Sequence, residues 1–154
     1  MAELVLGVNC NASGVFTAVV AQSDSGFEIL STERLTFSIE TADAIRDLHH
    51  VLRTVLLAAK TQGVGKIAIL RCSAGAHGSS VEAVKAEAIV ERVAASELTL
   101  GLQRIAPQGL PKALKCGSGE KWQARARQLF NLKGEIKHWN GTDGAVCAAY
   151  KAML

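Results

Sequence analysis

Apolar positions along the chain follow two different periods, and the way these periods alternate predicts the elements of the fold. Residues 4–8 form a short continuous apolar run, which is typical of a strand buried on both faces of a sheet. Further apolar stretches at 15–21 and 27–37 are separated by the turn Asp24-Ser25-Gly26, which indicates an antiparallel hairpin. The chain therefore opens with three antiparallel strands.

A helical period begins after residue 40. Between a cap at Thr41 or Asp43 and a stop at Gly63, apolar residues recur every three or four positions and predict a helix. A buried strand is expected over 66–70, and a second helix runs from Ser79 or Ser80 to about residue 95. The residues expected to line the inner face of this second helix are Val81, Val84, Ala88, Ile89 and Val93.

The remaining third of the chain predicts one more strand and then helices. The strand is expected over 98–105, followed by a short helix around 110–114, a Gly-Ser-Gly break at 117–119, a helix over 120–132 and a last helix from about Thr142. Three antiparallel strands followed by parallel crossovers predict an α/β fold with a mixed five-stranded sheet and helices on both faces. With 154 residues the chain suits a single domain over 1–154.

Composition indicates in which cellular compartment the protein is expected. No apolar run reaches the roughly 18 residues that a membrane span needs. The N-terminal segment lacks the basic region of a secretory signal. The cysteines are scattered without a Cys-x-x-Cys pair, which disfavours disulfide and zinc frameworks. We therefore expect a cytoplasmic protein with reduced thiols and no membrane partner.

The positive charge is concentrated in one segment. The chain as a whole carries +3, but residues 112–137 hold seven basic and two acidic side chains, a net of +5, whereas residues 1–111 carry −2. This distribution fits either a solvated helix face or a surface that contacts phosphates of DNA or RNA.

Four stretches resemble the RuvC family of Holliday-junction resolvases, within the ribonuclease-H-like superfamily, and occur in that family's order. Residues 6–11 (LGVNCN) resemble the end of its first strand, and residues 85–90 (KAEAIV) the helix after its fourth. Residues 105–107 with 112–121 resemble its fifth-strand exit and the lysine-rich, glycine-broken segment beyond. Residues 142–150 (TDGAVCAAY) resemble its last helix. The resemblance implies a ribonuclease-H-like fold with strand order 3-2-1-4-5.

The resemblance also implies where a metal site would lie. Such nucleases use two Mg²⁺ or Mn²⁺ ions about 4 Å apart, held by carboxylates. The corresponding positions here are Asn9, Leu70, Asn140 and Asp143; a shifted register would make Asp143 and Val146 the last two. One carboxylate survives in either alignment. We therefore expect no catalytic residues and no metal cofactor, and Arg71, beside Leu70, could pair with Asp143 instead.

The histidines and Cys10 are further candidates for a metal ligand or a nucleophile. His77, His138 and Asp143 could converge on a single metal ion, although surface histidines are the simpler interpretation. His49 and His50 lie on the first helix, where one ring is expected to pack and the other to face solvent. Cys10 would act as a nucleophile only beside a base, and we expect it to be buried.

The glycine-broken part of the basic segment is the candidate nucleic-acid site. Glycines allow backbone N–H groups to approach an anion, and basic side chains flank the glycine break. The sequence of the break does not match a Walker-type phosphate loop. The residues assigned to phosphate contact are Lys112, Lys115, Ser118, Lys121 and Arg125.

Three functions remain in competition. The first is a pseudo-nuclease that binds nucleic acid or acts as a scaffold. The second is an active Mg²⁺- or Mn²⁺-dependent endonuclease whose site is rebuilt from Asp143, the histidines and Glu87. The third is a protein–protein interaction module without nucleic-acid binding. A homodimer is also expected, because the resembled resolvases pair through helices on one side of the sheet.

Overall fold

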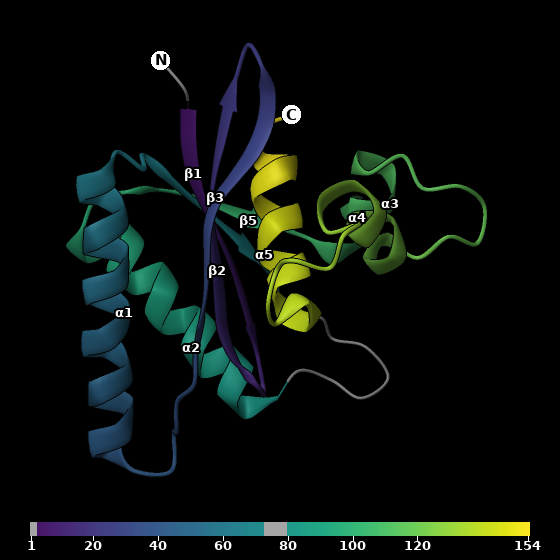
Figure 1. Cartoon of the computed structure of the whole chain (residues 1–154). Coiled ribbons are helices and arrows are strands. Elements are labelled where there is room, and N and C mark those ends of the chain that lie inside the picture. The colour runs from purple at the N-terminus through teal and green to yellow at the C-terminus, as the bar shows by residue number, and fades with distance from the viewer. Residues whose placement is uncertain (1–2, 73–79) are drawn as a thin grey trace.

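The computed structural model describes residues 3–72 and 80–154 (Figure 1). The strands are β1 (Glu3–Asn11), β2 (Gly14–Ser23), β3 (Gly26–Leu35), β4 (Lys66–Leu70) and β5 (Gly101–Ile105). The α-helices are α1 (Ala42–Gln62), α2 (Val81–Arg92), α3 (Leu110–Ala113), α4 (Trp122–Phe130) and α5 (Trp139–Ala152). A π-helical turn (Val93–Glu97) extends α2, and a 3₁₀ turn (Pro107–Gly109) precedes α3.

The five strands form one sheet in the order β3-β2-β1-β4-β5. The first three are antiparallel to one another, and β4 and β5 run parallel to β1. This confirms the predicted strand order and its mixed character.

Helices cover both faces of the sheet (Figure 1). On one face, α1 and α2 pack over a core that includes Leu52, Leu56 and Ile67. On the other, α5 lies along the sheet, with α3 and α4 beyond it, over a core that includes Phe16, Leu70 and Leu110. Thr41, one of the two caps that the sequence allowed, caps α1 by accepting the N–H of Ala44. Gly63 ends the helix in a left-handed conformation, as the sequence predicted.

The helix α5 approaches β1 unusually closely. An added Cβ on Gly7 would lie 1.8 Å from the carbonyl oxygen of Ala145, so only glycine fits at this position. The facing turns of α5 are built from small, fully buried residues, Ala145, Ala148 and Ala149. Close approach to the central strand fixes where the start of α5 lies relative to the end of β1.

Two predictions about the second helix and the fifth strand are wrong. Val81 and Val84 are 60% and 50% exposed, and the buried stripe of α2 consists of Ala83, Ala86 and Val90. Of the predicted inner residues, Val93 is fully buried and Ile89 packs against the core. The helix has apolar residues on more than one face. The alanine-rich face is the buried one, because small side chains permit closer packing. The strand β5 begins at Gly101 and not at residue 98, because residues 98–100 connect the π-helical turn to the strand and Thr99 has a φ of 53°, which is not an extended conformation.

Among the described residues, no helix combines the length and the apolar character that crossing a membrane requires.

Candidate functional site

One row of side chains crosses the whole sheet at the end where β1 and β4 finish. Successive partners in this row are Arg34, Phe16, Asn9, Leu70 and Ile105, one from each strand. Directly paired residues point to the same face of a sheet, and Phe16, Leu70 and Ile105 belong to the core on the α5 side. The row therefore lies beneath the start of α5, where the resemblance places the acids of a nuclease.

Asn9 and Asp143 meet at the entry to α5. The side-chain amide of Asn9 donates a hydrogen bond from Nδ2 to the carbonyl of Gly141 at 2.9 Å. Oδ1 of Asp143 accepts the backbone N–H groups of Gly141 at 3.0 Å and Gly144 at 2.7 Å. Gly141 has a φ of 119°, a left-handed conformation that favours glycine. The side chains of Asn9 and Asp143 therefore both hold Gly141: Asn9 binds its carbonyl group and Asp143 binds its N–H group.

Asp143 is a buried carboxyl, only 8% exposed. Burial raises the pKa of this carboxyl above its ordinary value, while the two N–H donors and the Arg127 guanidinium on α4 counteract part of the rise. Asp143 therefore acts as an internal cap of the kinked helix entry, in an environment that disfavours its charge.

The expected pairing of Arg71 with Asp143 is wrong. Among the described residues, no ion pair joins them. Arg71 is the first residue after the end of β4. Its backbone N–H donates to the carbonyl of Ile105 at 2.9 Å, and its exposed side chain borders a cleft.

The other two positions that the resemblance assigns to a metal site differ in their surroundings. Leu70 is 6% exposed, and its Cδ2 lies 2.9 Å from the position of a Cβ added to Gly144. Asn140 is exposed at the kink before the regular part of α5, where its φ and ψ are not helical. Val146, the alternative from the shifted register, is fully buried in the core. Of these three residues, only Asn140 is exposed to solvent.

A cleft of about 490 Å³ opens beside Asn9 at this end of the sheet. Its polar and aromatic lining comes from β1, the ends of β4 and α2, and the first turn of α4. These side chains are Asn9, Asn11, Arg71, Ser80, Trp122 and Gln123. The contributions of Trp122 and Gln123 were not predicted, because nothing in the local sequence indicates that α4 folds back to the end of β1.

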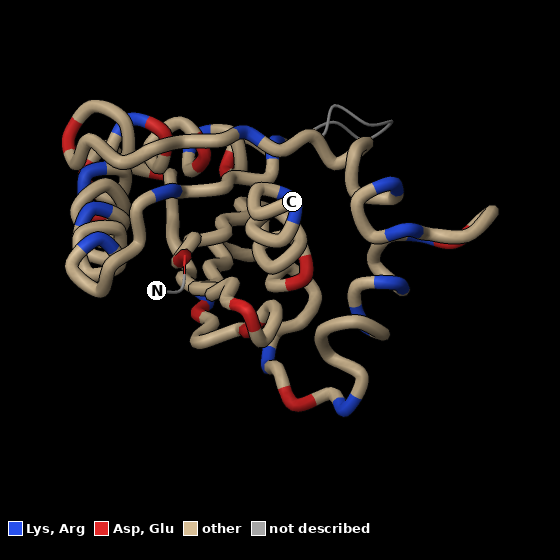
Figure 2. The backbone as a smooth tube through the Cα atoms, turned by 90° about the horizontal axis from the view of Figure 1, so that it is seen from above, with Lys and Arg blue, Asp and Glu red and all other residues tan. Residues whose placement is uncertain are grey.

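The basic segment forms a separate lobe, which we call the α3–α4 lobe (residues 110–130). Figure 2 shows its Lys and Arg residues spread along the backbone with little acidic charge among them. Lys112, Lys115, Ser118 and Lys121 are exposed. Arg125 is partly buried, and its Nε donates to the carbonyl of Leu114 at 3.1 Å.

The glycine break itself is less open than expected. The N–H of Gly117 donates to the Glu120 carboxylate at 3.0 Å, and the N–H of Glu120 returns to the Gly117 carbonyl at 3.1 Å. This backbone donor is therefore already satisfied, and any anion contact here would rest on the exposed lysines and Ser118.

The histidines of α1 lie on the face of the sheet that α1 covers, whereas Cys10 borders the cleft. His49 is bonded through Nε2 to Glu97 at 2.6 Å, on the face covered by α1, while His50 is exposed. His77 lies outside the described residues. Within 3–72 and 80–154, no three His, Cys, Asp or Glu side chains gather closely enough to hold a metal ion. Burial raises the pKa of the Cys10 thiol, and this residue is only 5% exposed.

This topology, with the entry to α5 set over the ends of β1 and β4, is a ribonuclease-H-like fold, and solved RuvC structures share it. The RuvC structure of Thermus thermophilus superposes with a TM-score of 0.73 at 16% identity, covering 96% of this chain and 92% of that one. The same protein in complex with a Holliday junction substrate gives a TM-score of 0.69 at 16% identity, covering 96% and 91%.

A eukaryotic resolvase has the same fold. The yeast mitochondrial Holliday junction resolvase Ydc2 gives a TM-score of 0.65 at 12% identity, covering 96% of this chain and 75% of that one. No known protein family matches the sequence itself, and no curated protein does either. The likeness therefore concerns the fold.

Proposed function

We propose that this chain is a nucleic-acid-binding domain of RuvC-type fold that does not cleave its ligand. One observation carries the proposal. At the end of the sheet where a two-metal nuclease needs carboxylates, Asn9 is bonded to the Gly141 carbonyl, Leu70 is packed into the core, and Asp143 caps the start of α5.

The donors present do not suit two hard divalent cations. Mg²⁺ and Mn²⁺ take oxygen ligands, chiefly carboxylates, whose charge offsets that of the metal. Leu70 offers no donor atom. The Nδ2 of Asn9 is a hydrogen-bond donor that turns toward a carbonyl, and the first oxygen of Asp143 already accepts two N–H groups. Four positive charges would face one carboxylate, which favours binding without metal-dependent cleavage.

Two surfaces support nucleic acid as the ligand. Trp122 and Arg71 line the same cleft as Asn9 and Asn11. An aromatic ring can stack on a base, and an arginine can pair with a phosphate. The exposed lysines of the α3–α4 lobe supply further positive charge next to α4, the helix that contributes Trp122. The Thermus thermophilus protein of the same fold has been captured with a Holliday junction substrate, which favours the same ligand class.

The proposal is tested by measuring binding and cleavage on the same substrates. Labelled four-way junction, single-stranded and double-stranded DNA are incubated with the protein at low salt, with Mg²⁺ and then with Mn²⁺. The Thermus thermophilus RuvC serves as a positive control. We expect salt-sensitive binding and no product with either metal. Isothermal titration should show no Mg²⁺ or Mn²⁺ binding in the low micromolar range.

Each alternative has a distinct result. Metal-dependent cleavage that disappears in Asp143→Asn would replace the proposal with a nuclease whose site has been rebuilt. Absence of binding to every nucleic acid at low salt would favour a protein–protein interaction module. Repeating the binding assay with RNA of the same sequences separates a DNA-binding from an RNA-binding domain.

A further inference from the structure

A second hollow lies on the β3 side of the α5 entry, and it is lined by basic side chains. This hollow, which we call the arginine pocket, has a volume of about 400 Å³ and is lined by Arg34 of β3, Arg127 of α4, and His138 and Asn140 at the start of α5. The remaining lining residues are Ser13, Phe16 and Trp139. Donors thus approach it from three different elements.

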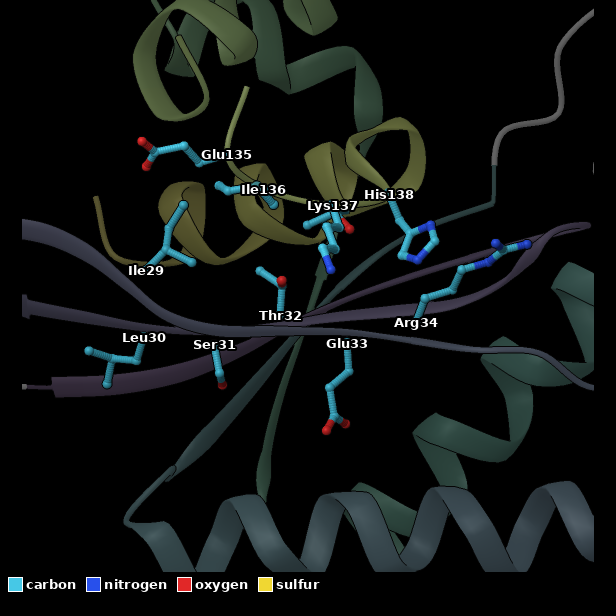
Figure 3. A pocket seen from close by; sticks show the side chains of 11 residues that line it. Ile29, Leu30, Ser31, Thr32, Glu33, Arg34, Glu135, Ile136, Lys137 and His138 are labelled. Carbon is cyan, nitrogen blue, oxygen red and sulfur yellow. The ribbon is translucent and has the colours of Figure 1, made fainter. Parts of the chain in front are cut away.

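Arg34 is held in place by groups that carry no charge. Its Nε and Nη2 donate to the carbonyl of Ser13 at 3.3 and 3.1 Å, and its guanidinium lies 5.8 Å from the centroid of the Phe16 ring. Figure 3, which looks into the neighbouring pocket along β3, shows Arg34 and His138 on the same side of the strand and Glu33 on the other. The positive charge of Arg34 therefore remains available toward the pocket.

Arg127 is likewise without a fixed carboxylate partner. Neither Arg34 nor Arg127 takes part in an ion pair with any described residue. The acid that Arg127 does influence is Asp143, whose first oxygen is occupied by two backbone N–H groups. Two arginines thus line one hollow, and neither forms an ion pair with a described residue. Like charges brought together in this way repel each other, and a bound anion would offset the repulsion.

We propose that the arginine pocket binds a phosphate group. Arginine presents planar pairs of donors that match phosphate oxygens, and donors from three directions suit a tetrahedral anion better than a planar carboxylate. Choosing a nucleic-acid phosphodiester as the source of this phosphate rests on the proposed function. Free phosphate or a small phosphate ester would offer the same chemistry.

The position of the pocket relative to the cleft supports the phosphodiester. Arg34 pairs with Phe16, and Phe16 with Asn9, so Arg34 lies two strands from the cleft, about 10 Å at the usual strand spacing. Both hollows open at the same end of the sheet. If a base of a nucleic-acid strand occupies the cleft beside Trp122, the neighbouring phosphates of that nucleic acid are within reach of the arginine pocket.

The test compares charge-removing variants in the full-length chain. Binding of a fluorescein-labelled single-stranded 12-mer is followed by anisotropy as salt is increased, for wild type, Arg127→Gln and Arg34→Gln/Arg127→Gln. The matched control, Arg46→Gln/Lys85→Gln, removes the same charge from exposed positions on α1 and α2. We expect the double variant to lose roughly tenfold or more in affinity and the control to change little. Arg127 is exposed, so the single variant Arg127→Gln is expected to fold and keeps the test valid if the double variant misfolds.

A second measurement separates the two sources of phosphate. Inorganic phosphate is titrated into ¹⁵N-labelled wild type at constant ionic strength set with chloride, and the Arg34 and Arg127 side-chain signals and the His138 ring signals are followed. Saturable shifts of these signals without oligonucleotide binding would contradict the proposed function and support the pocket as a site for free phosphate. Oligonucleotide binding that is equal in wild type and in both arginine variants would overturn the pocket and leave the proposed function standing. Loss of oligonucleotide binding in natively folded Arg127→Gln supports the pocket.

Discussion

Replacing Asp143 in two different ways tests whether its carboxyl caps α5 or serves a charged role. Asp143→Asn keeps an oxygen in the position that accepts the N–H groups of Gly141 and Gly144, and it removes the buried charge. Asp143→Ala removes the acceptor altogether. The structure predicts that only Asp143→Ala lowers the free energy of unfolding.

The magnitudes follow from the hydrogen bonds and from burial. A buried donor left without an acceptor costs about 1–3 kcal/mol, and Asp143→Ala leaves two such donors. We expect it to lower the free energy of unfolding by about 2 kcal/mol or more, which corresponds to roughly 4–8 °C in Tm. Asp143→Asn should be as stable as wild type or more stable at neutral pH, because burial penalises the ionised carboxyl.

The pH dependence has a definite sign. Burial raises the pKa of Asp143 in the folded state, so in the range just above the ordinary carboxyl pKa the folded protein holds a proton that the unfolded chain has released. Stability contributed by this group is therefore present at low pH and is lost as pH rises through the folded-state pKa. Relative to Asp143→Asn, wild type should become less stable as pH increases across this range.

Urea unfolding of wild type and both variants at several pH values between 4 and 8 provides the assay. Asp47→Asn, at an exposed site on α1, is the matched control and should leave the unfolding free energy unchanged. The capping argument would be refuted if Asp143→Asn were as destabilised as Asp143→Ala. It would also be refuted if wild type gained stability over Asp143→Asn with rising pH.

Three further predictions concern the site, the lobe and the assembly. Asn9→Asp, which restores an acid, should lower the urea midpoint by the equivalent of about 1–3 kcal/mol, because a carboxylate cannot donate to the Gly141 carbonyl; an unchanged midpoint would contradict this. Lys115→Glu/Lys121→Glu should weaken DNA binding and flatten its salt dependence while leaving Tm nearly unchanged, since both side chains are exposed; binding equal to wild type would leave the lobe as a solvated face. Sedimentation at tens of micromolar should show a homodimer that Val84→Glu, on the exposed side of α2, converts to monomer, whereas a monomeric wild type removes the dimer prediction.

The local sequence predicted the elements that burial and capping define on their own. Residues 66–70 form β4 with the expected bounds, because an apolar run lies between glycines and a charged residue. The helix α1 runs from its Thr41 cap to its Gly63 stop, and its apolar period identified most of its buried face. The strand order followed from the resemblance, and the sheet confirms it.

Tertiary packing decided everything that depends on two distant segments meeting. The sequence left two registers open for the last helix, and only the packing of α5 against the sheet shows that Asn140 is exposed and Val146 is fully buried. The predicted inner face of α2 is wrong at Val81 and Val84, because periodicity does not say which of two apolar stripes packs closer. Arg34 and Arg127 lie on β3 and α4 and are brought together by the fold alone. A hydrophobic period reports the environment of one element, whereas a pocket depends on how the backbones of several elements pack against each other.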